Sequence, residues 1–315
     1  MHRLIALAFA ALLALALTCA AAAEARSPRV ERVDYHGWSG AYRLTNGTVE
    51  LVFVPQVGRI LRYGFLGGPN VLWEKEALRG KTVSPTEGGD WVNFGGDKLW
   101  PAPQSRWGWP PDPHLDRGEH QVEVLPGGRV QVTGPISPKG EIRFSRIIAL
   151  APSGTGVTLT NRLHNAGSRE VEWSVWEVAQ VDAPDRAGLP LYQRGRFPQG
   201  YRVFETSPPV PGNVTTRGDA VWLTRDPQKG GKIGGDSPQG RVWAELKGLR
   251  FEISASHERG ASYPDEGCSL EIWSNPDPDR YMELEVLSPL RKIPPGKSAA
   301  YVTRWKLSRL NESQK

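Results

Sequence analysis

Short apolar stretches, most of them bounded by glycine, proline or other turn residues, recur along most of the chain. In several of them apolar and polar residues alternate one by one, as in Arg129–Thr133, where Val130 and Val132 lie between polar neighbours. Such alternation places every second side chain on one face of a β-strand. The 35 glycines and 27 prolines are spread evenly, which favours turns over long helices. The pattern predicts strands at Val49–Pro55, Ile60–Phe65, Gln121–Leu125, Arg129–Thr133, Glu141–Leu150, Gly156–His164, Glu170–Val181, Ala220–Thr224, Arg241–Leu246, Arg250–Ser256, Ser269–Ser274, Arg280–Leu287 and Ala299–Leu307.

Many of these expected strands follow one another closely enough to be joined by tight turns. Hairpin turns are indicated at Leu125–Arg129 and at Lys247-Gly248, and Gly230–Gly235 is predicted to be a flexible loop. No long Gly-Ser or Pro-rich linker and no internal repeat divides the chain. We therefore predict a single all-β domain over residues 26–315, folded as a large antiparallel two-sheet sandwich.

The first 25 residues form a segment of a different kind. Arg3 precedes the apolar run Leu4–Leu17, and Ala23–Ala25 has the small residues of a cleavage site, which is typical of a secretory signal peptide. An uncleaved membrane anchor is the alternative, because the apolar stretch continues beyond Leu17 and just reaches spanning length. We expect the mature chain to begin near Arg26, to be periplasmic or secreted, and to have no membrane contact after cleavage.

Charge and cysteine content narrow the classes of function. The formal net charge is +5, and no basic run is longer than Arg291-Lys292. Such scattered charge argues against a nucleic-acid-binding stripe and against a polybasic membrane patch. Loss of the leader removes Cys19 and leaves Cys268 alone, so the mature chain has no internal disulfide. Cys268 is predicted to be a buried apolar residue.

The segment Asn93–Trp109 is the densest group of candidate ligand contacts. It combines three tryptophans with a Gly-Gly turn, two prolines and several polar residues. Aromatic faces and directional polar groups suit a sugar ring, which has an apolar face and a rim of hydroxyls. The alternative is a loop whose tryptophans only pack on one another. The predicted sugar contacts in this segment are Asp97, Lys98, Trp100, Gln104, Trp107 and Trp109.

Several segments resemble the galactose mutarotase-like superfamily. Leu44–Trp73 is similar to the first hairpin of those enzymes, Phe94–Pro101 looks like the Gly-Gly-x-x-x-Trp-Pro segment of hexose-phosphate epimerases, and Val157–Gly167 resembles a strand that ends in Asn-x-Gly. Together with Trp176–Gln180, these segments make residues 31–307 similar to a family of secreted bacterial proteins of unknown function within the superfamily. The resemblance implies a β-supersandwich with a concave cleft of the size of a sugar.

Carboxylates late in the chain are candidates for a catalytic base. Alternation places Glu283 and Glu285 on the same face of one strand as Tyr281, and places Glu271 beside Trp273 on the preceding strand. If the strands pair, three carboxylates gather on one face, and crowding with partial desolvation raises carboxyl pKa values toward the range of a base. The alternative is an ordinary solvent-facing side of a sheet. By resemblance, Glu285 matches the family glutamate, with Glu283 as second choice and Glu271 as a ligand contact.

The general acid expected from the resemblance is missing. Where mutarotases carry a histidine, this chain has Trp176–Gln180, so Glu177 and Gln180 are predicted to contact the sugar, and neither replaces the histidine. His114 and His120 are predicted to be surface loop residues. Lys98 is an alternative acid, although an ion pair with Asp97 at a turn is the simpler interpretation.

No cofactor and no metal are predicted, because the chain lacks dinucleotide and phosphate-binding motifs and the histidines lack ligand spacing. Three functions stay open. The first is an exported carbohydrate-binding protein, and the second is an aldose 1-epimerase-type enzyme with a glutamate base. The third is a structural or interaction module of the cell envelope, in which side chains would fill the cleft. The expected partner is a sugar or oligosaccharide, and no nucleic acid is expected.

Overall fold

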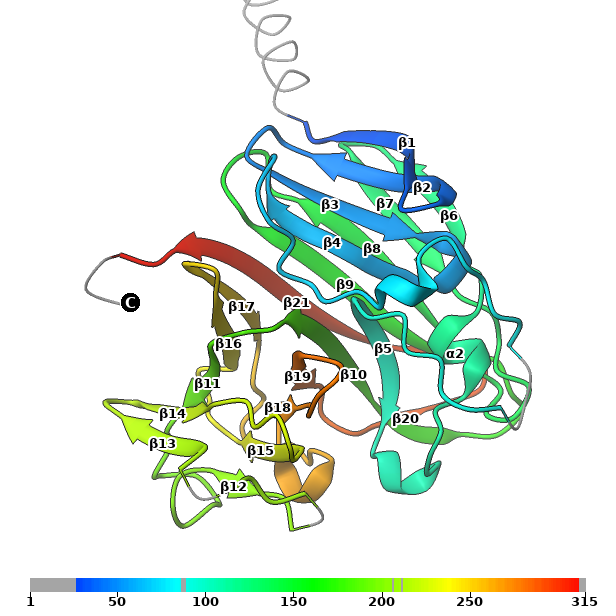
Figure 1. Cartoon of the computed structure of the whole chain (residues 1–315). Helices are drawn as coiled ribbons and strands as arrows, with labels where there is room; N and C mark the ends of the chain where they lie inside the picture. The colour runs from blue at the N-terminus through cyan, green and yellow to red at the C-terminus, as the bar shows by residue number, and fades with distance from the viewer. Residues whose placement is uncertain (1–26, 86–88, 206, 211, 312–315) are drawn as a thin grey trace, which may run out of the picture.

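The computed structural model describes residues 27–85, 89–205, 207–210 and 212–311. The predicted leader, residues 1–25, lies outside these ranges. Two large sheets form most of the described part, and all of their strand pairings are antiparallel. The predicted all-β, two-sheet architecture is therefore confirmed (Figure 1). No helix among these residues has the length and apolarity needed to cross a membrane.

Within the described residues, one sheet has eleven strands and the other has ten. The first sheet has the order β1 (Arg29–Tyr35), β2 (Trp38–Thr45), β3 (Val49–Val54), β4 (Arg59–Phe65), β5 (Asp97–Ala102), β10 (Val171–Asp182), β19 (Tyr281–Leu287), β18 (Leu270–Ser274), β15 (Gly231–Gly235) and β12 (Arg202–Val203), with β20 (Arg291–Ile293) paired to β10. The second has the order β13 (Val214–Arg217), β14 (Ala220–Leu223), β11 (Arg186–Pro190), β16 (Arg241–Leu246), β17 (Leu249–Ala255), β21 (Ser298–Arg309), β9 (Val157–Asn165), β8 (Ile142–Leu150), β7 (Arg129–Thr133) and β6 (Gln121–Leu125). The helical pieces are short, namely α2 (Pro113–Arg117) and the 3-10 turns η1 (Pro55–Val57), η2 (Glu76–Leu78), η3 (Gln104–Arg106) and η4 (Asp265–Gly267).

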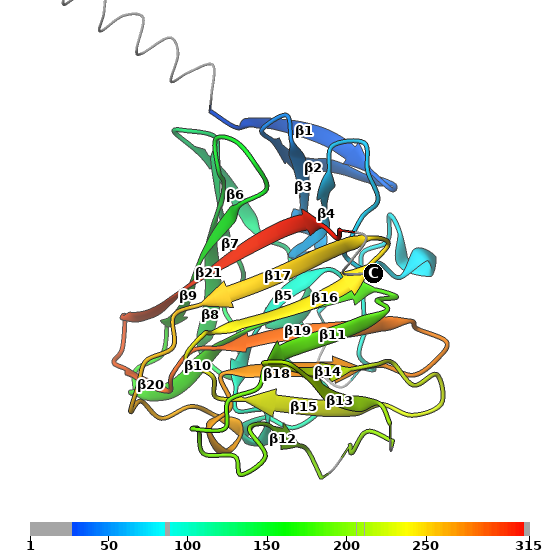
Figure 2. The same cartoon turned by 90° about the vertical axis from the view of Figure 1, so that its left-hand side faces the viewer.

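The main apolar core lies between the two sheets. In β8 and β9 buried residues alternate with partly exposed ones, and the buried set packs against apolar residues of the first sheet, such as Leu51 and Leu284. Figure 2 shows β21, β17 and β16 running side by side in the second sheet. Each buried aliphatic side chain contributes about 1.5–3 kcal/mol, so this interface is the main source of stability. Cys268 is fully buried, as predicted.

The strands with clear alternation lie within two residues of the bounds expected from the sequence, whereas the glycine-rich strand was not expected. β6, β7 and β16 match the predicted ranges. The prediction of a flexible loop at Gly230–Gly235 is wrong, because Gly231–Gly235 is β15, paired with β18. Four of the six residues in Gly230–Gly235 are glycines, which have no side chain, so the segment has no alternation to detect. Pairing with a neighbouring strand determines its structure.

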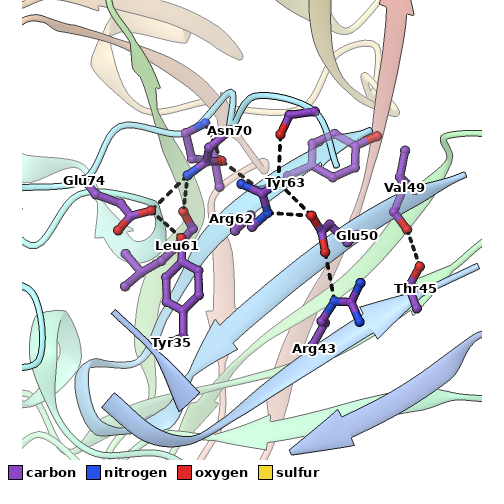
Figure 3. Close-up of polar contacts among 12 residues, drawn as sticks. Tyr35, Arg43, Thr45, Val49, Glu50, Leu61, Arg62, Tyr63, Asn70 and Glu74 are labelled. Atoms are coloured by element: carbon purple, nitrogen blue, oxygen red, sulfur yellow. Dashed lines mark hydrogen bonds and ion pairs between the residues drawn. The ribbon is translucent and has the colours of Figure 1, made fainter. Parts of the chain in front are cut away.

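Asn70 anchors the connection that follows β4 (Figure 3). Its Oδ1 accepts from the Tyr63 amide at 3.0 Å, and its Nδ2 donates to the Leu61 carbonyl at 2.8 Å and to Glu74 at 3.0 Å. These bonds hold the turn after β4 against the strand. A few residues later, the Trp73 amide donates to the carbonyl of Gln180 in β10 at 2.8 Å. The connection is thus also hydrogen-bonded to β10 near the C-terminal end of that strand.

Candidate functional site

A cleft of about 420 Å³ lies on the face of the first sheet that points away from the second sheet. Strand alternation sends one set of side chains from β5, β10, β19 and β18 into the core and the other set toward this cleft. Volumes of about 300–1,000 Å³ are typical of small-molecule sites. The cleft is lined by Trp91, Trp100, Gln104, Trp109, Trp176, Phe204, Ser207, Lys232, Asp265, Trp273, Asn275, Tyr281, Glu283 and Glu285.

The predicted gathering of carboxylates on one face is confirmed. β18 and β19 pair in a register that sets Glu271 opposite Glu285 and Trp273 opposite Glu283. Met282, Leu284 and Val286, the alternate residues of β19, belong to the core between the sheets. Three carboxylates therefore share the cleft side of two neighbouring strands.

Lys232 of β15 neutralises two of these carboxylates. Its Nζ lies 2.6 Å from Glu271 Oε2 and 2.9 Å from Glu285 Oε2. Burial raises the pKa of both glutamates, and Lys232 opposes this rise. Burial also works against the charge of Lys232, but Glu271 and Glu285 outweigh it and raise the pKa of the lysine. The sequence did not indicate Lys232, because it lies among the glycines predicted to be a loop.

Glu283 is paired with a different lysine. Lys98 Nζ lies 3.2 Å from Glu283 Oε1, and Gln180 Nε2 donates to the same oxygen at 2.9 Å. The ammonium also lies 4.5 Å from the centroid of the Trp100 ring. Burial, opposed by Glu283 and reinforced by Arg59, lowers the pKa of Lys98. A lysine with a lowered pKa and a carboxylate thus share one hydrogen bond at the cleft.

Two predicted sugar contacts, Asp97 and Glu177, are instead fully buried between the sheets. Asp97 pairs with Arg146, and Glu177 Oε1 accepts from Trp305 Nε1 at 2.8 Å. The predicted Asp97–Lys98 ion pair at a turn is also wrong. These residues are neighbours in β5, so their side chains point to opposite faces. Glu177 faces the core for the same reason, because β10 turns both of its sequence neighbours toward the cleft.

Asp116 fixes the positions of two cleft tryptophans. It accepts from Trp100 Nε1 at 2.8 Å and from Trp91 Nε1 at 3.2 Å, and its Oδ1 lies 2.8 Å from Arg59 Nη2. Asp116 and Arg59 are almost completely buried, so this pair is part of the interior. No sequence pattern indicated Asp116, since its partners lie 16 to 57 residues away.

Three other predicted contacts belong to the segment Asn93–Trp109 and border two different cavities. Gln104 and Trp109 line the cleft, and Trp109 is 56% exposed. Trp107 borders a neighbouring cavity, and its Nε1 donates to the Pro101 carbonyl at 2.7 Å. His120 lies in a loop, as predicted, but it is half-buried rather than at the surface. Its ring packs edge to face against Phe53, and burial lowers the pKa of His120 to about 4.

Several solved structures are similar to this chain. A galactose mutarotase-like protein from Lactobacillus casei has a TM-score of 0.57 and 10% identity, with 85% of this chain and 100% of that chain covered. A galactose mutarotase-like protein from Clostridium acetobutylicum has a TM-score of 0.56 and 11% identity, with 90% and 100% covered. A TPR-domain containing protein from Parabacteroides distasonis has a TM-score of 0.59 and 17% identity, with 87% of this chain covered. This chain spans only 48% of that last protein.

At these identities the similarity shows the fold, which is galactose mutarotase-like. No curated protein matches the sequence. A family model, described as Domain of unknown function (DUF4380), matches residues 41–203, just over half of the chain. The matched part includes β5 and β10, which carry Lys98, Trp100 and Gln180. The chain is thus a member of the DUF4380 family.

Proposed function

We propose that the cleft binds a sugar. The observation that carries this proposal is the composition of the cleft, in which tryptophans form the walls and Glu283 and Glu285 lie at the base. Indole faces match the apolar face of a pyranose, and the carboxylates accept hydrogen bonds from its hydroxyls. The mutarotase-like fold of the neighbours supports the proposal. A purely structural module would fill this space with side chains, but the cleft has a volume of about 420 Å³ and Trp109 is exposed.

A second candidate function is aldose 1-epimerase chemistry at the same site. It is favoured by the contact of 3.2 Å between Lys98 Nζ and Glu283 Oε1. In this reaction a carboxylate removes the proton of the anomeric hydroxyl, the bond between C1 and the ring oxygen breaks as the carbonyl forms, and an acid protonates the ring oxygen. Reclosure by the reverse steps gives either anomer. Glu283 is proposed as the base, held in place by Lys98. Lys98 is only 1% exposed and does not line the cleft, so water is proposed as the acid that protonates the ring oxygen.

The choice of Glu283 rather than Glu285 follows from exposure and partners. Glu285 is 1% exposed and is bound by Lys232 and by Trp176 Nε1, which donates at 2.8 Å. Both glutamates line the cleft, but Glu283 is 8% exposed. A base must reach the hydroxyl from which it takes the proton. Glu285 is proposed to fix the positions of Lys232 and Trp176 at the base of the cleft.

The test combines calorimetry with NMR on the mature chain and a panel of freshly dissolved aldoses and disaccharides. Trp109→Ala is expected to weaken sugar binding by roughly 1 kcal/mol, about fivefold, because an exposed ring face is lost. Glu283→Gln is expected to keep the affinity and to abolish accelerated anomer exchange. Glu123→Gln, on the exposed surface of β6, is the matched control and should change neither.

The outcomes separate the candidates. Sugar binding with exchange at the spontaneous rate would remove the epimerase candidate for those sugars and keep the binding proposal. A folded protein with no affinity for any member of the panel would refute both, and would favour a structural or interaction role in the envelope.

We also propose that the protein acts outside the cytoplasm, on the basis of the leader-like residues 1–25. Mass spectrometry of the protein from periplasmic and culture fractions tests this proposal. A mature N-terminus near Arg26 would support it, and a full-length cytoplasmic chain would refute it.

A further inference from the structure

A second cavity, of about 630 Å³, lies directly beside the cleft. Trp100 and Trp109 line both spaces, so a ligand longer than one ring could pass from one to the other over the exposed face of Trp109. The walls of the second cavity are mainly apolar and rigid. They include Trp107, Trp109, Trp173, Pro101, Pro110 and Pro111.

Arg117 is the unusual residue of this second cavity. It ends α2, lines the cavity and is only 4% exposed. Among the described residues it has no ion pair and no hydrogen bond, and its Nε is buried without a partner. Arg59 is also buried, but it is paired with Asp116 at 2.8 Å. A buried cation without a partner is costly, and a ligand anion would remove that cost.

The remaining charged groups make the cavity attractive to an anion. Lys139 lines it from an exposed turn and has no ionic partner in the described part of the chain. Arg106 is already paired with Glu172 at 2.9 Å. Among the described lining residues the only carboxylate is that of Asp112, which accepts from the His114 amide at 2.8 Å and from the Ser137 hydroxyl, and its Oδ1 lies 3.5 Å from the His114 ring. The described lining thus has two unpaired cations and one carboxylate with its own partners.

We propose that this cavity is a second subsite, which binds an anionic group carried by a saccharide whose neighbouring ring occupies the cleft. This inference rests on the proposed sugar binding and specifies the ligand as an acidic oligosaccharide. The planar guanidinium of Arg117 presents paired donors that match a carboxylate, a phosphate or a sulfate, and Lys139 adds a point charge. The tryptophan walls accept the face of the ring that bears the anion.

The test measures binding of matched ligands to the mature chain by calorimetry. The ligands are neutral disaccharides of glucose, galactose and mannose, the same disaccharides with a terminal uronic acid, and their 6-phosphate esters. At low salt the best acidic ligand is expected to bind roughly tenfold more tightly than its neutral counterpart, as for a charge-assisted hydrogen-bonded pair, and this advantage should shrink in high salt. The comparison of uronate with phosphate identifies the anion.

Substitutions in the second cavity test whether the preference for acidic ligands arises there. Arg117→Met is expected to abolish the preference for the acidic ligand, to leave the affinity for the neutral disaccharide unchanged and to keep or raise the melting temperature. The matched control is Arg59→Met, which removes an equally buried but paired arginine and should lower the melting temperature. Lys139→Met, at an exposed position, should reduce the preference severalfold without affecting folding.

Failure of this inference is distinguishable from failure of the proposed function. Neutral ligands that bind as tightly as acidic ones would overturn the subsite and leave sugar binding intact. If no disaccharide binds, the proposed function fails, and the subsite is then judged with glucuronate alone, whose binding must depend on Arg117. A loss of thermal stability in Arg117→Met equal to that in Arg59→Met would also overturn the inference, because Arg117 would then be a structural residue.

Discussion

Asp116 connects the interior of the protein to the walls of the cleft. Its carboxylate is shared between the guanidinium of Arg59 and the indole N–H groups of Trp91 and Trp100. One side chain therefore neutralises a buried cation and orients two aromatic walls. A carboxylate of this kind acts on a ligand only through the rings that it holds.

Asp116→Asn is expected to destabilise the protein by about 3–5 kcal/mol, because it leaves Arg59 as an uncompensated buried charge. Denaturant unfolding monitored by tryptophan fluorescence measures the change. The double variant Arg59→Met/Asp116→Asn should recover part of the loss, since it removes both charges. An Asp116→Asn protein with the unfolding midpoint of the wild type would show that the ion pair contributes little.

At the scale of elements, two glycines determine where β5 begins. Gly95 has φ of 90°, and a Cβ added there would lie 2.2 Å from the carbonyl oxygen of Trp73. Next to it, the Gly96 amide donates to that same carbonyl at 2.7 Å. The backbone of this segment therefore passes so close to its neighbour that no side chain fits.

Gly95→Ala is expected to cost several kcal/mol of unfolding free energy, because it combines an unfavourable φ with a backbone clash. Gly127→Ala isolates the first effect. Gly127 has φ of 78° with open space around the added Cβ, and the expected cost there is only about 1 kcal/mol. Thermal unfolding of both variants gives the comparison, and equal costs would rule out the clash as the main effect.

The predictability of each element from the sequence depended on side-chain alternation. β6, β7 and β19 show it, so their positions and the shared face of Glu283 and Glu285 could be predicted. β15 is mostly glycine, and β5 follows two glycines and contains a proline, so both looked like loops. For this reason Lys232 was not predicted as a site residue, and Asp97 was predicted to face the cleft although it faces the core. Asp116 could not be predicted, because its contacts join distant parts of the chain.

At the scale of the whole molecule, a buried polar network connects the two sheets. Arg146 of β8 pairs with Asp97 of β5, and its Nε donates to Asn161 at 2.6 Å. Asn161 in turn donates to Glu177 of β10 at 2.7 Å. Arg146 thus pairs with Asp97 and also lies 3.7 Å from Glu177 Oε2. Burial, together with the nearby charge of Glu177, raises the pKa of Asp97 to about 7 in spite of Arg146.

This raised pKa predicts how the stability depends on pH. The folded state holds a proton on Asp97 that the unfolded chain releases near pH 4, so this group favours folding at low pH. Its contribution is lost as the pH rises from about 4 to about 7, and amounts to a few kcal/mol at about 1.4 kcal/mol per unit of pKa difference. In Asp97→Asn this component of the slope should disappear. Denaturant unfolding between pH 4.5 and 7.5 measures it.

Asp219→Asn, at an exposed position before β14, is the control for the loss of a carboxylate and should leave the slope unchanged. If Asp97→Asn and the wild type lose stability in parallel over this range, Asp97 is not the group responsible.

The order of the sheets has a consequence for how the protein is made. β21, the last strand among the described residues, lies between β17 and β9 in the second sheet. Its register joins Trp305 to Val157, residues separated by about half of the sequence. Until β21 has left the ribosome, β9 and β17 each present an open edge that could pair with other chains. Folding with so many distant contacts is slow. We expect the nascent chain to depend on chaperones until β21 has paired with both strands.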